Sequence, residues 1–533
     1  MVYSGVDGNL WLQPVPGGAM RRITDCSADR PAQAPMVTPD NAQVVYVVDQ
    51  SETWIQHLDG GSPTRIDDGS ADFCFDPSIT PDGSHAMWQA WNVPDMAWDA
   101  ARIERFDLRS GVRTTVEASG AIQQPRTTAD GFDLCVRDDT GWNNVWLGDR
   151  PLVDEAYEHG GPTWGLGQRS FVSSPNSAHV AFTRNEGGFG RLCIVDTVTG
   201  EVTERARGVH GQLSWQGHHL AALRTGARTP PQIVVHDTRS WDRRVIDVGS
   251  LSGWEDESLV EPELVEVTAR DDVTVFARLY RADQPTDRMI CWLHGGPTDQ
   301  WQVTFMPRLA YWRSRGFNVL VPDHRGSTGH GRAYQQAMNH RWGDVDVTDT
   351  IDVVRHAHVS GWGAPQRTVL IGGSAGGFTV LGVLGASTDG AGSADLVACA
   401  VVSYAVTDLY DVAERGDRFE RHQTHHLVAP LPNERPTAGL YVHRSPISFA
   451  ERITTPLLML HGDADPVVPV EQSIAMAEQI SAHGGVVQLH VYAGEGHGFR
   501  IPANQLDEYR RMTAFIDEHI GTARGPNSLG SHP

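Results

Sequence analysis

The chain has 533 residues, of which 40% are hydrophobic and 20% are charged, and its formal net charge is −23 at pH 7. A chain of this length exceeds one ordinary domain and predicts two large domains, each with its own core. The acidic balance, without a cationic patch in the sequence, argues against a nucleic-acid partner or an anionic membrane surface.

The cysteines and the N-terminal residues restrict the compartment. No C-x-x-C pair occurs, so the spacing argues against a zinc site and against a small disulfide framework. Residues 1–5 lack a basic and apolar leader, and no apolar run is long enough to cross a membrane. We therefore expect a cytoplasmic protein without a metal or another cofactor. The six cysteines are Cys26, Cys74, Cys135, Cys193, Cys291 and Cys399.

Residues 1–255 predict an all-β domain built from a repeated unit. Each unit begins with a polar turn and continues as alternating apolar strands, and successive turns are 42, 48 and 46 residues apart. Periods of this size are typical of the four-stranded blades of a β-propeller. Five or six units can be recognised, and the first is shortened. The clearest turns are Thr38–Asn41, Thr80–Gly83, Thr128–Gly131 and Ser174–Ser177, with a weaker one at Ser214–Gly217.

The pattern changes after the acidic run Glu255–Glu257, and residues 256–521 alternate apolar strands with helical segments. Alternation of this kind predicts a mostly parallel, doubly wound sheet with helices on both faces. Residues 522–533 have the composition of a disordered tail. The expected strands are 264–268, 273–280, 289–293, 319–322, 368–371, 397–402, 457–460 and 487–492. The expected helices are 347–358, 375–385, 470–481 and 505–519.

The segment Val369–Phe378 organises the second domain. An apolar strand rich in β-branched residues meets four glycines around Ser374, and a helical pattern follows. A buried strand that turns at once into a helix holds its turn residue in a strained conformation, and small neighbours are needed two positions to either side. Such a turn exposes the serine hydroxyl at the positive end of the helix. Ser374 is therefore the candidate nucleophile, although a glycine-rich turn can contain a serine by chance.

Two further motifs follow predicted strands and complete a candidate triad. His461–Asp465 comes after one strand and Glu495–Phe499 after the last. A serine hydroxyl needs a neutral imidazole to take its proton, and the imidazole needs a carboxylate to orient it. His497 is the expected base and Asp465 the expected carboxylate, with Asp463 as its competitor. The order serine, aspartate, histidine is that of an α/β-hydrolase.

An acyl transfer also needs two donors for the oxyanion. The backbone N–H of Ala375, directly after the nucleophile, is one expected donor. The other should come from Gly295 or Gly296, where missing side chains let the backbone approach a substrate, and Gly296 is preferred. A near copy of that motif, His159–Thr163, follows polar residues instead of a buried strand and predicts a loop between blades.

In combination these motifs resemble the prolyl oligopeptidase family of serine peptidases, in particular its acylaminoacyl-peptidase and dipeptidyl-aminopeptidase-like branch. The resemblance implies a propeller followed by an α/β-hydrolase domain that cleaves short peptides. Acylaminoacyl peptidases often carry arginine two residues after the catalytic aspartate, where this chain has Val467, and the paired glutamates of dipeptidyl peptidases are not recognisable. The matching segments are His294–Pro297, Arg325–Gly331, Trp342–Gly343, Gly372–Gly377, Arg444–Ile447, His461–Pro469 and Gly496–Phe499.

Three functions are compatible with these residues. The first is a serine peptidase that acts near the N-terminus of short peptides, and the second uses the same triad on an ester or a small-molecule amide. The third is a propeller interaction module with an idle hydrolase. A homo-oligomer is compatible with each of them. His422, His425 and His426 form a possible metal set, but no carboxylate accompanies them in a familiar pattern, which favours a solvated loop.

Overall fold

The computed structural model describes residues 1–251, 253–254, 259–386, 395–433 and 439–520. Contacts divide the chain into two compact units. The N-terminal unit comprises Met1–Ser250 with the short returns Gln302–Phe305 and Gly329–Ala333, and the C-terminal unit comprises Leu251–Trp301, Met306–Thr328 and the chain from Tyr334 onward. The predicted boundary between residues 255 and 256 and the predicted tail 522–533 lie outside the described residues.

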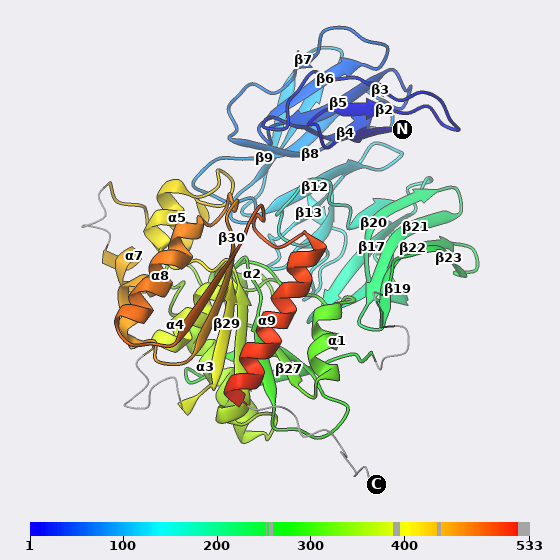
Figure 1. The fold of residues 1–533 in the computed structure, drawn as a ribbon. Helices are drawn as coiled ribbons and strands as arrows, with labels where there is room; N and C mark the ends of the chain where they lie inside the picture. The colour runs from blue at the N-terminus through cyan, green and yellow to red at the C-terminus, as the bar shows by residue number, and fades with distance from the viewer. Residues whose placement is uncertain (252, 255–258, 387–394, 434–438, 521–533) are drawn as a thin grey trace. The chain divides into compact units, whose positions relative to one another are not determined.

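The N-terminal unit is a β-propeller of six antiparallel sheets (Figure 1). Its first sheet has three described strands, β1 (Val2–Ser4), β2 (Leu10–Leu12) and β3 (Arg21–Arg22). The next two are β4 (Ala32–Val37), β5 (Gln43–Val48), β6 (Glu52–His57), β7 (Thr64–Arg65), and β8 (Phe73–Ile79), β9 (His85–Trp91), β10 (Arg102–Asp107), β11 (Arg113–Glu117). The last three are β12 (Ile122–Thr127), β13 (Asp133–Arg137), β14 (Asn144–Leu147), β15 (Arg150–Pro151); β16 (Phe171–Ser173), β17 (His179–Glu186), β18 (Phe189–Asp196), β19 (Val202–Arg207); and β20 (Val209–Gln216), β21 (His219–Gly226), β22 (Thr229–Asp237), β23 (Arg243–Val248).

The repeated polar turn joins the first and second strands of the sheets. In the second and third sheets the hydroxyl of Thr38 donates to Asp40 and that of Thr80 donates to Asp82, each over 2.6 Å. The same bond recurs between Thr128 and Asp130 at 2.6 Å, and Ser174 donates to Asn176 at 2.8 Å in the fifth sheet. A hydroxyl followed two residues later by a carboxylate or amide fixes a turn locally. The repeat seen in the sequence is therefore a turn motif of the scaffold.

The C-terminal unit is an α/β-hydrolase domain with one eight-stranded sheet. The strand order is β24-β25-β27-β26-β28-β29-β30-β31, in which β24 and β25 are antiparallel to their neighbours and the remaining pairs are parallel. The strands are β24 (Glu263–Thr268), β25 (Thr274–Tyr280), β26 (Met289–Leu293), β27 (Asn318–Asp323), β28 (Thr368–Gly373), β29 (Cys399–Ser403), β30 (Leu457–Gly462) and β31 (Val487–Tyr492).

Helices cover both faces of this sheet because each strand buries both of its faces (Figure 1). In β26, Met289, Cys291 and Leu293 join a core with α3 (Val345–Val359), α4 (Ala375–Gly385) and α8 (Val470–Ala482). The alternate residues Ile290 and Trp292 join a second core with α1 (Pro307–Ser314) and α9 (Pro502–Ile520). The two cores hold the parallel strands in register, so that their carboxyl ends share one edge.

Besides α1, four of the helices that the structure describes were not predicted from the sequence. They are short, at five to seven residues, and lack the repeated apolar period that identifies a longer helix: α2 (Arg332–Gln336), α5 (Leu409–Arg415), α6 (Gln423–Leu427) and α7 (Gly439–Arg444). None of the helices in the described residues is both long enough and apolar enough to span a membrane. All six cysteines are free thiols.

Candidate active site

Ser374 occupies a strained turn between β28 and α4. Its backbone angles are φ 55° and ψ −126°, outside the regions that an ordinary residue prefers. The tight turn requires small neighbours: a Cβ added to Gly376 would lie 2.5 Å from the carbonyl oxygens of Leu293 and His294. A Cβ on Gly372 would lie 2.4 Å from the carbonyl oxygen of Gly376. Packing of β26, β28 and α4 thus dictates the glycines on both sides of the serine.

The structure brings Ser374, His497 and Asp465 together from the ends of three strands. The Nε2 atom of His497 lies 2.9 Å from Oγ of Ser374, and its Nδ1 atom lies 2.8 Å from Oδ2 of Asp465. Because a carboxylate only accepts, Nδ1 carries the proton and Nε2 is left to accept from the serine hydroxyl. The side chain of His497 is 21% exposed and that of Asp465 is fully buried. The imidazole therefore faces solvent while its orienting carboxylate does not.

Asp465, and not its competitor Asp463, faces His497. Its second oxygen accepts the backbone N–H groups of Val467 and Val468 at 2.8 and 3.0 Å. Burial alone would raise the pKa of Asp465, but hydrogen bonds to His461, His497 and Val468 outweigh it and hold the pKa well below the usual range. Asp463 is exposed and instead accepts the N–H of Gly494 at 2.7 Å.

His461 is a second, fully buried imidazole beside Asp465. Its Nδ1 lies 2.7 Å from the hydroxyl of Ser473, and its Nε2 lies 2.9 Å from the carbonyl oxygen of Val468 and 3.4 Å from Oδ2 of Asp465. Since the Val468 carbonyl can only accept, Nε2 is the protonated nitrogen, and its N–H points at the carbonyl and the carboxylate together. His461 thereby fixes the loop that carries Asp465.

Glu495 and Tyr404 position the loop that carries His497. The carboxylate of Glu495 accepts the backbone N–H groups of Arg500 and Ile501 at 2.8 and 2.9 Å, so it fastens the loop to the start of α9. The ring of Tyr404 lies 4.7 Å from the imidazole of His497, between centroids. Tyr404 follows β29, so four parallel strands contribute to this site.

Two backbone N–H groups are available beside the serine. Ala375 begins α4, and its N–H has no acceptor among the described residues, as the first turn of a helix allows. The N–H of Gly296 is likewise without an acceptor in that part of the chain. The loop containing Gly296 is adjacent, because a Cβ on Gly295 would lie 3.5 Å from Cβ of Ser374. These are the donors predicted for an oxyanion, and their role stays a prediction.

The buried side chain of His294 holds the loop that contains Gly295 and Gly296. It is fully buried, its Nδ1 lies 2.8 Å from the carbonyl oxygen of Gly295, and its Nε2 lies 2.8 Å from the hydroxyl of Ser327. Burial lowers the pKa of His294 to about 4, so the imidazole is neutral near pH 7. A neutral ring can donate to the carbonyl from Nδ1 and accept from Ser327 at Nε2, which holds the Gly295–Gly296 backbone in one orientation.

Sequence reasoning did not single out His461, Glu495 or Tyr404. His461 and Glu495 stand inside quoted motifs, where their buried hydrogen bonds were the missing information. The predicted solvated loop at His422–His426 is corrected: the segment includes the short helix α6, and its histidines are half-buried. In the described residues no group of three metal-ligating side chains is placed to hold an ion.

The near copy at His159–Thr163 lies between β15 and β16, as predicted for a loop between blades. His159 is fully buried, and its Nε2 lies 2.8 Å from the carboxylate of Glu155. Its Nδ1 accepts the N–H of Val145 at 3.2 Å. The motif thus ties its loop to β14, and among the described residues its hydrogen-bond network contains no nucleophile.

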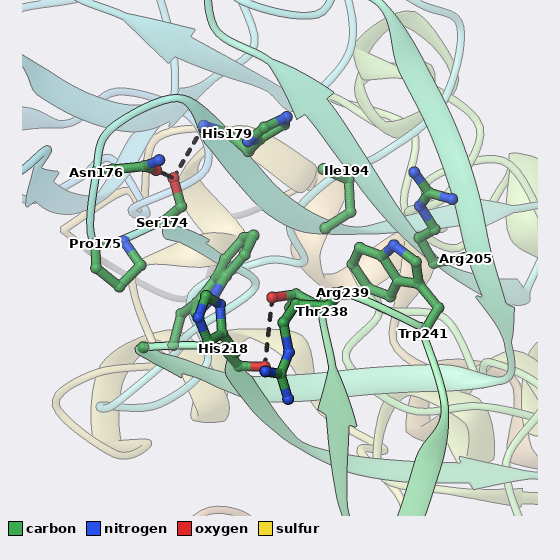
Figure 2. Close-up of a pocket in the computed structure, with 12 residues that line it drawn as sticks. Ser174, Pro175, Asn176, His179, Ile194, Arg205, His218, Thr238, Arg239 and Trp241 are labelled. Atoms are coloured by element: carbon green, nitrogen blue, oxygen red, sulfur yellow. Dashed lines mark hydrogen bonds between the residues drawn. The ribbon is translucent and has the colours of Figure 1, made fainter.

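The propeller contains a separate hollow of about 430 Å³ between its last two sheets (Figure 2). Its walls are turn residues and aromatic side chains, with Arg205 stacked 4.6 Å above the ring of Trp241. The hydroxyl of Ser174 donates to Asn176, and that of Thr238 donates to the carbonyl of His218 over 3.3 Å. These polar groups complete their own turns, so we place the chemistry in the C-terminal unit.

The sheet topology and the strained serine turn define the C-terminal unit as an α/β-hydrolase domain. Residues 303–523 match the family model described as the prolyl oligopeptidase family.

Known proteins resemble the chain in sequence and in fold. Dipeptidyl peptidase family member 6 of Caenorhabditis elegans is 27% identical over 48% of this chain and 34% of its own. The acylamino-acid-releasing enzyme of Arabidopsis thaliana is 28% identical over 44% of this chain and 30% of its own. A crystal structure of puromycin hydrolase has a TM-score of 0.86 at 27% identity and covers 98% of this chain and 84% of that one. The matched region therefore spans about a third of these two curated relatives.

Proposed function

We propose that the protein is a serine peptidase that hydrolyses short peptides near their N-terminus. The observation that carries the proposal is the chain of two hydrogen bonds from Ser374 through His497 to Asp465. Nucleophilic attack by a hydroxyl requires a serine in contact with an imidazole, and the imidazole in contact with a carboxylate. The family of residues 303–523 supports a peptidase over other chemistries of the same fold.

The chemistry proceeds in two halves. Oγ of Ser374 attacks the carbonyl carbon while Nε2 of His497 takes the hydroxyl proton, and the buried carboxylate of Asp465 stabilises the imidazolium. The imidazolium then gives its proton to the leaving amine as the C–N bond breaks, which leaves an acyl-enzyme on Ser374. A water molecule, deprotonated by His497, attacks the ester and releases the acid and the free serine.

The oxyanion formed in each half is stabilised by the N–H groups of Ala375 and Gly296. Donors of this kind contribute about 3–4 kcal/mol each in comparable sites, because they are already aimed at the developing charge. His294 keeps the Gly295–Gly296 backbone fixed, so little reorganisation accompanies the reaction. The strained Ser374 backbone serves the same end by keeping the hydroxyl at the helix N-terminus.

A short peptide is the proposed substrate, and the similarity to an acylamino-acid-releasing enzyme and to a dipeptidyl peptidase family member supports cleavage near a peptide's N-terminus. A second candidate is hydrolysis of a small-molecule amide or ester by the same residues. The similarity to puromycin hydrolase favours it, since puromycin is itself a small aminoacyl amide. The cytoplasmic location and a homo-oligomeric state stay predictions.

Purified protein can be tested with three chromogenic substrates: an aminoacyl p-nitroanilide, its N-acetylated form and p-nitrophenyl acetate. We expect the wild-type protein to hydrolyse at least one amide, and Ser374→Ala to lose turnover by about 10⁴-fold or more. Peptides and puromycin, compared as competing substrates by mass spectrometry, separate the two candidate functions.

The matched control is Ser481→Ala, which removes an exposed serine from the last turn of α8. It should retain the wild-type rate within about twofold, because surface substitutions rarely matter. If Ser374→Ala kept more than a trace of turnover while remaining folded, the proposed nucleophile would be wrong.

A further inference from the structure

The hollow between the fifth and sixth sheets of the propeller has a volume of about 430 Å³ (Figure 2). This volume is within the range of sites that hold small molecules. Two arginines and two histidines line the hollow, and none of its described lining residues is acidic, although the chain has 66 acidic and 43 basic residues. The walls are therefore positive in a protein that is negative overall, which favours an anion. The four residues are Arg205, Arg239, His179 and His218.

Arg205 enters the hollow from a β-bulge in β19. Glu204 and Ala206 each face a residue of β18, whereas Arg205 between them faces none. A bulge of this kind redirects a side chain out of the regular alternation of a strand. The guanidinium lies over the ring of Trp241, 4.6 Å from its centre (Figure 2). Stacking occupies one face of the guanidinium and leaves its N–H edges free.

The positive charge of Arg205 has no carboxylate beside it. Arg207, two residues further along β19, forms an ion pair with Glu204 at 3.5 Å. Arg239, in the opposite wall, forms one with Asp237 at 2.6 Å. Within the described residues Arg205 forms no ion pair and no side-chain hydrogen bond, and its guanidinium contact is the cation–π contact described above. Its N–H donors are therefore available to an anionic ligand.

Trp241 lines the hollow from a strained backbone position. Its φ is 62°, a conformation that bulky residues rarely adopt, and its N–H donates to the carbonyl of Asp237 at 2.6 Å. Strain of this kind persists where the surrounding structure enforces it, and it concentrates at ligand-binding sites. Trp215 and Trp241 pack against the cluster that contains the buried Ile194. These three side chains give the hollow an apolar surface beside the charge of Arg205.

The polar turn residues around the hollow already have their own hydrogen bonds. The hydroxyl of Ser174 donates to Asn176, and that of Thr238 donates to the carbonyl of His218. The groups left for a ligand are the free guanidinium of Arg205 and the indole rings. A carboxylate can accept two N–H bonds from a guanidinium, and an aromatic ring packs well against an indole. A ligand that uses both carries a carboxylate next to a flat apolar body.

We propose that this hollow is a binding site for a small aromatic carboxylate, with the carboxylate on Arg205 and the aromatic ring against Trp215 and Trp241. Aromatic carboxylates should bind more tightly than their neutral amides, because a charge-assisted pair of hydrogen bonds is stronger than a neutral one. The site lies within the propeller, and the inference does not rest on the hydrolytic activity proposed for the C-terminal unit.

The test titrates the whole protein with 3-(4-fluorophenyl)propionate and with its primary amide, and follows the line width of the ligand's fluorine NMR signal. We expect saturable binding of the acid with a Kd of about 1 mM or tighter, and binding of the amide at least about tenfold weaker. Arg205→Gln should weaken binding of the acid about 10- to 100-fold and change binding of the amide by less than about twofold. Trp241→Gly should weaken both ligands, and the turn should survive because glycine adopts a positive φ freely.

The matched control is Arg244→Gln, which neutralises an exposed arginine in β23 outside the hollow. It should bind the acid within about twofold of wild type. Arg205→Lys keeps the charge without the planar fork and should retain part of the affinity. Reaction of the protein with a fluorophosphonate beforehand should leave the Kd of the acid unchanged, because the reagent modifies an activated serine and not the propeller.

Equal Kd values for the acid and the amide in the wild-type protein would overturn the inference. An unchanged Kd for the acid in folded Arg205→Gln would overturn it as well, and so would the absence of saturable binding to folded wild-type protein up to about 10 mM. Loss of acid binding after the fluorophosphonate reaction would overturn it by placing the ligand at Ser374 instead.

Discussion

The two units use polar side chains in opposite ways. In the propeller, hydroxyl-to-carboxylate bonds join residues two positions apart, and the same bond recurs from sheet to sheet. In the hydrolase domain, the bonds that matter join residues distant in sequence: Ser374 is 123 residues from His497, and Asp465 is 32 residues from it. The first kind of bond shapes a turn, whereas the second brings together the residues of the proposed active site.

The polar residues of the propeller turns differ from those of the proposed active site in two respects, repetition and burial. A recurring polar motif whose side chains form their hydrogen bonds within one turn has no donor or acceptor left for a substrate. Residues at the strand ends of the hydrolase domain, such as Ser374 and His497, occur once and are partly buried. We therefore expect substitutions at single long-range contacts to abolish activity and substitutions at repeated local contacts to change only stability.

The largest effect short of removing the nucleophile is expected at Asp465. Asp465→Asn should lower kcat by about 10⁴-fold, since the amide cannot hold the imidazole in the tautomer that accepts from Ser374. Asp463→Asn removes the competing carboxylate and should lower kcat by less than about tenfold, because the exposed Asp463 carboxylate accepts the N–H of Gly494 and not that of the imidazole. Steady-state kinetics on one amide substrate measures both. Equal losses of kcat in Asp465→Asn and Asp463→Asn would contradict the proposal that Asp465 is the carboxylate that orients His497.

Substitution of His461 should lower kcat less than substitution of Asp465 does. His461→Phe removes the buried hydrogen bonds to Ser473, Val468 and Asp465 while retaining a ring, and we expect kcat to fall about 10- to 100-fold with little change in KM. The loss of one donor to Asp465 should also make that carboxylate more basic, which strengthens its hydrogen bond to the imidazolium of His497, so the acid limb of the kcat profile should move to higher pH. His483→Phe, at an exposed site after α8, is the control. A uniform loss without a shift of the profile would indicate that His461 is only structural.

The Glu420 carboxyl should make the free energy of unfolding decrease as the pH rises. Its folded pKa of about 7 lies above the ordinary value of 4.5, so its contribution to stability is full below pH 4.5 and is lost as the pH rises through 7. The charged groups that act on its pKa are His497, which lowers it, and Asp417 and Asp465, which raise it. Glu420→Gln does not titrate, so it should be about 1–3 kcal/mol more stable than wild type at pH 8 and nearly equal at pH 4.5. Denaturant unfolding at the two pH values measures this difference. An equal gain in the free energy of unfolding of Glu420→Gln at both pH values would contradict a raised pKa for Glu420.

The smallest effect is expected in the propeller. Thr80→Val removes the hydroxyl that donates to Asp82 and should destabilise the fold by about 1 kcal/mol. Thr64→Val, at an exposed position in β7, should change stability by less than about 0.5 kcal/mol. Hydrolysis at a temperature where both variants are folded should match wild type. A large loss of kcat in Thr80→Val would show that the turns do more than shape the scaffold.

Much of this architecture was predictable because its determinants are local. The turn repeat from Thr38 to Ser174 predicted propeller units, and the glycines around Ser374 predicted a strand that turns directly into a helix. The motifs at Asp465 and His497 could be paired because parallel strands end at one edge of a sheet. Each of these predictions used the nearest neighbours in sequence and one rule of topology.

Other features depend on contacts that no local pattern encodes. The short helices α5 and α6 are stabilised by packing with Ala375 and Val468, which lie far away in sequence. His461 could be quoted as part of a motif, but its role required knowing that its ring is buried beside Asp465. Glu420 stands between α5 and α6 in a segment without a motif, and the rise in its pKa comes from burial in the folded domain.

The central claim is that the hydroxyl of Ser374 is activated by His497. Reaction of the folded protein with a fluorophosphonate, followed by digestion and mass spectrometry, tests this directly. We expect one adduct per chain, on Ser374, and strongly reduced labelling in His497→Ala. An adduct on a different residue, or no adduct in protein that retains its fold, would contradict it.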